Sequence, residues 1–242
     1  MNGEPTLDVN LGRTIALLRP LGIRIAVITN GSLLARPDVR EDLAGADWVS
    51  LKVDAVETDL WRRIDRPHGS LQLPAILEGM LAFSRAYRGE LVTETMLVKD
   101  LNDGTGAMRD AATFLARLGP SRAYLAVPTR PPAEEWVQSP DEAIVNRGYQ
   151  IFREKLIHVE YLIGYEGSEF ASTRDVEVDL LAITAVHPMR EDAVQEFLTR
   201  GGADWSLVGS LLANRRLVMT SYEGHTFYMR RLPQPGARHS PA

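Results

Sequence analysis

Segments with helical spacing of apolar residues alternate with short apolar runs from the start of the chain to about Arg130. The runs are mostly apolar on both faces, which is typical of strands that helices cover in a parallel sheet. Such alternation indicates repeated βα units, in which parallel strands are joined through helices. We therefore predict an α/β fold, with a partial βα barrel over residues 1–163.

Five strands are expected, all of them short and apolar. They lie at Ile23–Thr29, Trp48–Val53, Leu91–Val98, Ala123–Val127 and His158–Ile163. The expected helices carry apolar residues at three- and four-residue spacing. They lie at Leu7–Leu21, Pro37–Ala46, Leu71–Tyr87, Gly104–Leu118 and Asp141–Lys155. A proline-rich, acidic connector at Pro131–Pro140 leads into the last of these helices.

The pattern changes after residues 164–175, a polar and glycine-containing segment that we interpret as a linker. Three short helices are expected next, at Val176–Val186, Glu191–Arg200 and Trp205–Arg215. A hairpin is expected after them, with strands Leu217–Tyr222 and Thr226–Leu232 joined across Glu223-Gly224-His225. Three helices and a hairpin predict a small α+β domain of the winged-helix kind over residues 176–232. Residues 233–242 are expected to form a flexible tail.

The 242 residues contain no cysteine, which excludes disulfides, thiol nucleophiles and any cysteine-held zinc or iron–sulfur site built by this chain alone. The formal net charge of −5 excludes a globally basic nucleic-acid coat. The five histidines lack the spacing of a zinc site, so we expect no metal site. No secretory signal opens the sequence, and no apolar run approaches the ~20 residues that span a bilayer. These features predict a cytoplasmic protein.

Polar residues recur at the carboxyl ends of the predicted strands. In a parallel βα barrel these ends and the loops after them gather on one face, where binding sites lie. The residues are Thr29, Asn30, Lys52, Asp54, Glu94, Thr95, Thr129 and Arg130. Each taken singly is explained as a helix cap or a solvated loop residue. Their coincidence on one rim predicts a binding site.

Six segments resemble a known family in their order along the chain. They are GEPTL at residues 3–7, ITNGSLL at 28–34, SLKVDA at 50–55, RIDRPHGSL at 63–71, ETMLVKDLND at 94–103 and YLAVPTRPP at 124–132. This order resembles radical S-adenosylmethionine (SAM) proteins of the wyosine-synthase-like branch, and the match covers most of residues 3–132. The resemblance implies a barrel of the TIM type, SAM and a [4Fe–4S] cluster as cofactors, and an iron–sulfur oxidoreductase type of activity related to RNA modification.

The resemblance also implies roles for individual residues. Those that would hold the methionine end of SAM are Gly3, Glu4, Pro5 and Thr6. Those that would lie near the ribose and substrate are Thr29, Asn30, Lys52 and Asp54, and Val127 would lie near the adenine. The candidates for substrate contact are Arg66, His68, Glu94, Thr95 and Arg130. For the Arg66-Pro67-His68 segment the alternative is a turn that Pro67 stabilises.

The family's cluster is held by a Cys-x-x-x-Cys-x-x-Cys loop upstream of GEPTL, which this chain does not contain. We therefore expect a chain that is truncated at its N-terminus relative to the family, with an exposed sheet edge, no cluster ligands and no radical chemistry of its own. The start that carries Glu4 is expected to be poorly ordered. SAM affinity is accordingly expected to be no better than roughly millimolar. It should depend on Asn30, Lys52 and Asp54 more than on Glu4.

A second hypothesis is a protein without catalysis that binds a nucleotide or a partner through the barrel mouth and the winged-helix domain. Two arginines, Arg215 and Arg216, lie at the C-terminal end of the third expected helix of that domain. Two more, Arg230 and Arg231, lie at the end of its hairpin. Cations at a helix C-terminus are favourable without a ligand, and Asp204 occupies the end that would face base edges. Contact with protein or with the barrel is therefore favoured over nucleic-acid binding, and no membrane partner is expected.

Overall fold

The computed structural model describes residues 3–132, 134, 136–162, 175–185, 188–222 and 224–231. They divide into two compact units. The first comprises Met1–Pro128 and Glu134–Ile163, and the second comprises Thr129–Ala133 and Gly164–Ala242. The linker and tail predicted at residues 164–175 and 233–242 lie outside the described residues, except for Asp175.

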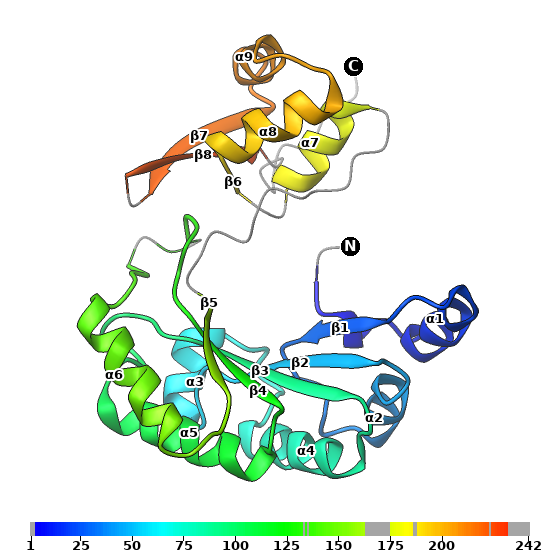
Figure 1. The fold of residues 1–242 in the computed structure, drawn as a ribbon, viewed down its shortest axis with the longest axis vertical. Coiled ribbons are helices and arrows are strands. Elements are labelled where there is room, and N and C mark those ends of the chain that lie inside the picture. Colours follow the sequence, from blue (N-terminus) through cyan, green and yellow to red (C-terminus); the bar gives the residue numbers. More distant parts are fainter. Residues whose placement is uncertain are drawn as a thin grey trace. The chain divides into compact units, whose positions relative to one another are not determined.

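The first unit is built on a five-stranded parallel sheet whose strands follow one another in chain order (Figure 1). The strands are β1 (Ala26–Thr29), β2 (Trp48–Lys52), β3 (Glu90–Met96), β4 (Arg122–Ala126) and β5 (Val159–Leu162). The prediction of a parallel sheet is confirmed. The first strand begins three residues later than expected, at Ala26, and Ile23 is exposed.

Helices connect the strands and cover one face of the sheet. They are α1 (Leu11–Leu18), α2 (Pro37–Leu43), α3 (Thr58–Asp65), α4 (Leu73–Ala86), α5 (Thr105–Leu118) and α6 (Glu142–Arg153). The alternation within β2 shows the two faces of the sheet: Val49 and Leu51 belong to the apolar core, whereas Lys52, at the end of the strand, is half-buried. The sheet therefore has an apolar face toward the helices and a polar face opposite it.

The first expected helix, Leu7–Leu21, is divided in the structure. A 3-10 turn at Pro5–Leu7 precedes α1, and another at Arg19–Leu21 follows it. Asp8 accepts a hydrogen bond from the Asn10 backbone N–H, so local hydrogen bonding interrupts the helix before α1 begins. Pro20 lies in the second turn, where its fixed φ favours a tighter helix.

Helix α3 was not expected from the sequence because its mean composition is polar and its apolar stripe is narrow. It begins where the Glu57 carboxylate accepts hydrogen bonds from the backbone N–H groups of Asp59 and Leu60, at 3.0 and 2.8 Å. Trp61 is its buried residue. It ends at Arg66, whose φ of 46° is left-handed and stops the helix.

In its described residues, the second unit contains three helices and a three-stranded antiparallel sheet in the order β6-β8-β7. Its elements are α7 (Val176–Thr184), β6 (Met189–Arg190), α8 (Glu191–Gly201), α9 (Ser206–Ala213), β7 (Leu217–Tyr222) and β8 (His225–Arg230). The predicted hairpin is confirmed as the β7–β8 pair. Strand β6 was not expected, because two residues carry no periodic pattern and its pairing with β8 spans 37 positions.

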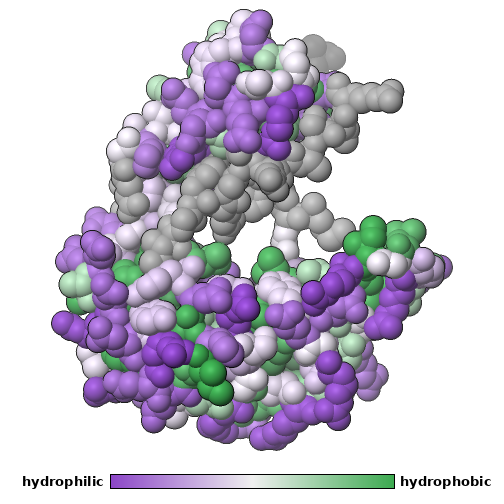
Figure 2. Space-filling view, viewed as in Figure 1, coloured by the Kyte–Doolittle hydropathy of each residue, from purple (hydrophilic) through white to green (hydrophobic). Residues whose placement is uncertain are grey.

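Exposed apolar side chains concentrate at the start of the first unit, around α1 and β1, where Figure 2 shows the apolar surface in green. They are Leu7, Val9, Leu17, Leu18, Leu21, Ile23 and Ile28. Among the described strands, β1 pairs with β2 alone, so it is an edge strand. The expectation of an exposed sheet edge is met here. In the part of the chain that the structure describes, no helix is long and apolar enough to cross a membrane.

Candidate functional site

Glu4 is tied to the end of β1 by its carboxylate. One oxygen, Oε1, accepts hydrogen bonds from the backbone N–H of Thr6 at 3.1 Å, from the Thr6 hydroxyl at 2.7 Å and from the Thr29 hydroxyl. The other oxygen, Oε2, accepts a hydrogen bond from the Asn30 backbone N–H at 2.8 Å. The expectation of a poorly ordered start at Glu4 is therefore wrong, because a residue 25 positions away supplies the missing support.

This anchored loop and the strand ends enclose a hollow of about 230 Å³, which we call the Glu4 hollow. Its lining includes seven residues predicted from the sequence: Gly3, Glu4, Pro5, Thr29, Asn30, Lys52 and Glu94. Ser50 and Ile28 complete it. Glu94 was assigned to the substrate, yet the register of β2 and β3 pairs it with Lys52. The structure thus brings it to the same hollow as the residues assigned to SAM.

Lys52 stands between two carboxylates. Its Nζ lies 3.2 Å from Asp54 Oδ2 and 3.2 Å from Glu94 Oε1. Burial alone would lower the pKa of the Lys52 ammonium, but the charges of Asp54 and Glu94 outweigh it and raise that pKa above its ordinary value. Lys52 therefore remains a cation at neutral pH, held in place at the end of β2.

Asp54 is buried and links β2 to β3. Its Oδ1 accepts a hydrogen bond from the Met96 backbone N–H at 2.7 Å. Its neighbour Asn102 is also buried and was not predicted from the sequence as a site residue. The Asn102 amide donates to the carbonyl oxygens of Asp54 and Met96, at 2.8 and 2.7 Å, and its Oδ1 accepts from the Val98 N–H at 2.7 Å. The only sequence signal for it was its place in the ETMLVKDLND segment.

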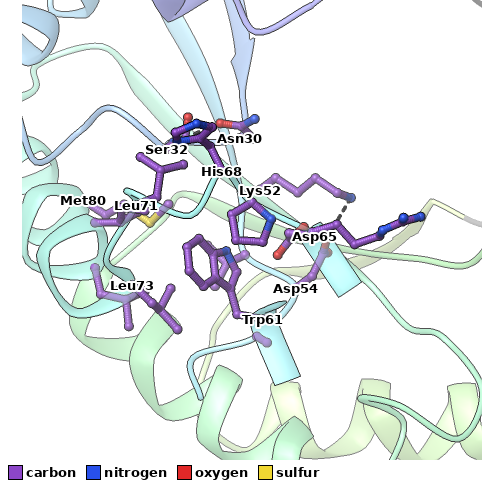
Figure 3. Close-up of a pocket in the computed structure, with 16 residues that line it drawn as sticks. Asn30, Ser32, Lys52, Asp54, Trp61, Asp65, His68, Leu71, Leu73 and Met80 are labelled. Atoms are coloured by element: carbon purple, nitrogen blue, oxygen red, sulfur yellow. Dashed lines mark hydrogen bonds and ion pairs between the residues drawn. The ribbon is translucent and has the colours of Figure 1, made fainter. Parts of the chain in front are cut away.

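A second cavity, of about 270 Å³, adjoins the Glu4 hollow because both are lined by Asn30 and Lys52 (Figure 3). We call it the Trp61 pocket. Trp61 and Asp65 of α3 line it, and leucine and methionine side chains of α4 form an apolar wall. Trp61 and Asp65 were not predicted as site residues because α3 was not expected from the sequence. Two of its substrate candidates, Arg66 and His68, do line this pocket.

Asp65 lies beside Asp54 in the Trp61 pocket (Figure 3). Desolvation and the charge of Asp54 raise the pKa of the Asp65 carboxyl to about 7, against the opposing pull of Lys52. The carboxyl can therefore hold or release a proton near neutral pH. His68 is exposed, and its Nδ1 lies 2.8 Å from the Ser70 hydroxyl.

Four predicted site residues lie elsewhere. Thr6 is buried, and its hydroxyl donates a hydrogen bond to the Glu4 carboxylate. Thr95 is also buried, and its hydroxyl donates to the Val53 carbonyl oxygen at 2.8 Å. Val127 is buried. Arg130 falls in the second compact unit. Their roles toward a ligand stay predictions, and the contacts of Thr6 and Thr95 are structural.

The side chains present at the site determine which cofactor they could bind. An iron–sulfur cluster is held chiefly by thiolates, and the chain contains no cysteine. Within the described ranges no three His, Asp or Glu side chains come together as a metal site would require. The residues therefore do not fit a [4Fe–4S] cluster. The Glu4 hollow has acceptors for an ammonium in Glu4 and Glu94 and a cation for a carboxylate in Lys52. It fits the amino-acid end of SAM.

Comparison with known sequences gives relatives of different closeness. Over 233 residues the chain is 41% identical to a UPF0026 protein of Methanocaldococcus jannaschii, an alignment that covers 96% of the chain and 73% of that protein. Over 109 residues it is 28% identical to an S-adenosylmethionine-dependent nucleotide dehydratase of Flammeovirga pacifica, covering 43% of the chain and 38% of that enzyme. No family model matches the chain.

Solved structures share the fold. A domain of pyruvate-formate lyase-activating enzyme from Bacteroides vulgatus matches with a TM-score of 0.53 and 20% identity, over 68% of the chain and 96% of that domain. A radical SAM methyltransferase from Sphaerobacter thermophilus matches with a TM-score of 0.50 and 18% identity, over 68% of the chain and 49% of that protein. The parallel sheet of the first unit is therefore similar to radical SAM domains in fold.

Proposed function

For this chain, which belongs to the UPF0026 family and whose first unit shares the fold of radical SAM domains, we propose that it binds SAM and that these 242 residues do not cleave it on their own. The observation that carries the proposal is the anchored Glu4 loop facing Lys52 across the Glu4 hollow. Opposite charges are fixed there at the ends of neighbouring strands, where parallel α/β folds bind ligands.

In this proposal, charged residues of the chain bind the ammonium and the carboxylate of SAM separately. A carboxylate offers about four acceptor positions, and among the described residues Oε2 of Glu4 accepts a hydrogen bond from the Asn30 N–H, so it can also accept one from the SAM ammonium. Lys52 supplies the cation for the SAM carboxylate, and Glu94 and Asp54 hold its Nζ in place. Asn30 lines both the Glu4 hollow and the Trp61 pocket, where it can hydrogen-bond the ribose.

SAM, when bound, carries the sulfonium whose carbon–sulfur bond radical SAM proteins break. The residues described above account for binding and orientation of SAM but offer no thiolate through which an electron could be delivered. We place the chain nearest the wyosine-synthase-like branch of radical SAM proteins. This finer assignment rests on the order of the six sequence segments between residues 3 and 132.

Calorimetric titration of the full chain with SAM tests the binding. The anchoring of Glu4 removes the cost of ordering its loop, so we now expect a Kd below ~1 mM, tighter than the sequence alone predicted. Glu4→Gln should weaken binding by about tenfold because a charged acceptor is lost. Glu41→Gln, an exposed glutamate on α2, is the matched control. Equal affinities for the native chain and Glu4→Gln would refute the assignment.

Anaerobic reconstitution tests the second half of the proposal. The chain is incubated with ferrous iron, sulfide and SAM, reduced with dithionite, and assayed for bound iron and for 5′-deoxyadenosine. We expect neither stoichiometric iron nor product. A chain that takes up iron and sulfide and releases 5′-deoxyadenosine would contradict the reading of its ligand set.

For the second unit we propose a winged-helix module that contacts protein. The support is its element order, in which α7, β6, α8 and α9 precede the β7–β8 hairpin. Helix α9, in the position of a recognition helix, has the sequence SLVGSLLA and carries no charged residue to meet phosphates. Anisotropy of labelled duplex DNA and hairpin RNA should stay unchanged on adding the chain. Saturable binding of either would favour a nucleic-acid role instead.

A further inference from the structure

A third hollow on the first unit combines arginines with an exposed tryptophan. It measures about 410 Å³ and is lined by Arg62, Arg63, Arg66, Leu101, Glu134 and Trp136. Arg62 and Arg63 lie in the last turn of α3, and Arg66 follows that helix directly. We call this hollow the arginine groove. It uses residues that the SAM assignment leaves without a role.

The charges of the arginine groove are unbalanced. Arg66 forms an ion pair with Glu134. Arg62 and Arg63 are exposed and form no ion pair with any residue that the structure describes. Three guanidinium groups therefore face a single carboxylate across one hollow, which leaves an excess of two positive charges. A phosphate monoester, which carries close to two negative charges at neutral pH, matches this excess.

Arginines near a helix C-terminus are favourable without any ligand, so the cations alone would not indicate a site. The second observation is Trp136, whose surface is 49% exposed and which lines the same hollow. An exposed indole beside guanidinium groups offers a flat apolar face for stacking of an aromatic ring. Leu101 extends that apolar surface. The groove thus combines a phosphate-binding end with a ring-binding wall.

The arginine groove also lies next to the Trp61 pocket. Arg66 lines both this groove and the Trp61 pocket, and the Trp61 pocket shares Asn30 and Lys52 with the Glu4 hollow. A molecule whose phosphate is held at the arginines would therefore lie at the outer end of a series of adjoining hollows. The inner end of that series is the Glu4 hollow.

We propose that the arginine groove binds a free 5′-nucleotide, with its phosphate at Arg62 and Arg63 and its base against Trp136. As a substrate assignment this rests on the SAM-binding function proposed above, whereas nucleotide binding itself does not require SAM. The phosphate accepts hydrogen bonds from the planar guanidinium groups, and the base stacks on the indole. Arg66 is paired to Glu134 and so marks the boundary between the groove and the Trp61 pocket.

Calorimetric titration of the full chain with GMP, in the absence of SAM, tests the proposal. The double variant Arg62→Gln/Arg63→Gln should bind GMP at least about tenfold more weakly, because both charge-assisted donors are lost. Arg117→Gln is the matched control, since Arg117 is an exposed arginine in the last turn of α5. Trp136→Leu should weaken GMP binding and leave the binding of inorganic pyrophosphate unchanged.

Several results would overturn the inference. They are an unchanged GMP affinity in the double variant, an equal loss in Arg117→Gln, guanosine binding as tightly as GMP, or no GMP binding by the native chain. Binding of a single-stranded RNA 12-mer without binding of GMP would also overturn it and would favour an RNA strand. All replaced side chains are exposed, and circular dichroism verifies folding. SAM titration of the same variants separates the two proposals, because the arginine variants should bind SAM as the native chain does.

Discussion

The two units differ in where their buried polar side chains find hydrogen-bond partners. In the first unit, buried polar groups bridge distant elements: Asp54 binds the Met96 N–H and Asn102 joins three backbone groups of two loops. In the second unit, the buried hydroxyl of Thr184 bonds within its own helix, and Arg190 pairs with Asp192 two positions away. Two long-range contacts of this unit, Arg216 with Glu177 and Tyr228 with Glu191, each involve a glutamate that is not buried. Burying polar groups is costly unless partners are built for them. The first unit bears this cost at its strand ends, where the proposed site lies.

The comparison predicts that removing a bridging polar group damages the first unit severely. Asn102→Ala leaves the Val98 N–H and the carbonyl oxygens of Asp54 and Met96 without their partner. We expect a loss of about 2–4 kcal/mol in the free energy of unfolding, since each unsatisfied buried group costs about 1–3 kcal/mol. Urea unfolding measures it, with hydrogen exchange at β3 assigning the loss to the first unit. A smaller loss than that of the exposed control Asn146→Ala would contradict the claim that bridging polar groups stabilise the first unit.

Two neighbouring threonines on one face of β3 test how much the first unit depends on satisfied buried polar groups. Thr95 donates to the Val53 carbonyl oxygen, whereas the buried hydroxyl of Thr93 has no hydrogen-bond partner among the described residues. Valine has nearly the same shape as threonine without the hydroxyl. Thr95→Val should therefore cost about 1 kcal/mol, and Thr93→Val should stabilise the fold by about 1 kcal/mol. Urea unfolding of both variants checks the signs, and the same sign for both would contradict the hydrogen-bond assignment.

Asp65 provides a pH-dependent test of the Trp61 pocket. Its carboxyl has a pKa of about 7 in the folded chain and an ordinary value of 3.8 when unfolded, so the native state binds the proton more tightly. The contribution of Asp65 to the free energy of unfolding is therefore complete below about pH 4 and is lost as the pH rises to about 7. Asp65 is exposed as a whole residue, although its carboxyl lies against Asp54 in the Trp61 pocket, so water screens part of this effect. Thermal melts from pH 4 to 8 should show this decline, and Asp65→Asn should remove it. An unchanged decline in the variant would assign it to another group.

The smallest effect is expected in the second unit. Asp192 pairs with Arg190 at the start of α8, and the side chain of Asp192 is 58% exposed. Such surface pairs contribute about 0.5 kcal/mol or less. Asp192→Asn should therefore lower the free energy of unfolding by no more than about that amount. A loss as large as that of Asn102→Ala would show that the second unit also depends on its polar pairs.

Local pattern was sufficient for the elements whose apolar residues repeat regularly. The parallel strands, the helices α4 and α5 and the β7–β8 hairpin all follow from periodicity and turn residues. Helix α3 has only eight residues and is polar on average, so its few apolar residues did not mark it in the sequence, and its burial of Trp61 depends on α4 and the sheet. Without α3, the sequence could not indicate that Asp65, Arg62 and Arg63 would line cavities.

The polar groups at the strand ends could be located from the sequence, since parallel strands that follow one another must present their carboxyl ends on one side. The sequence also determined that no thiolate is available to a cluster. The support of Glu4 by Thr29 and the sharing of Lys52 between Glu94 and Asp54 became visible in the folded structure alone. The Glu4–Thr29 and Lys52–Glu94 contacts join residues 25 and 42 positions apart. Their partners are selected by strand register and burial, which no local window of sequence contains.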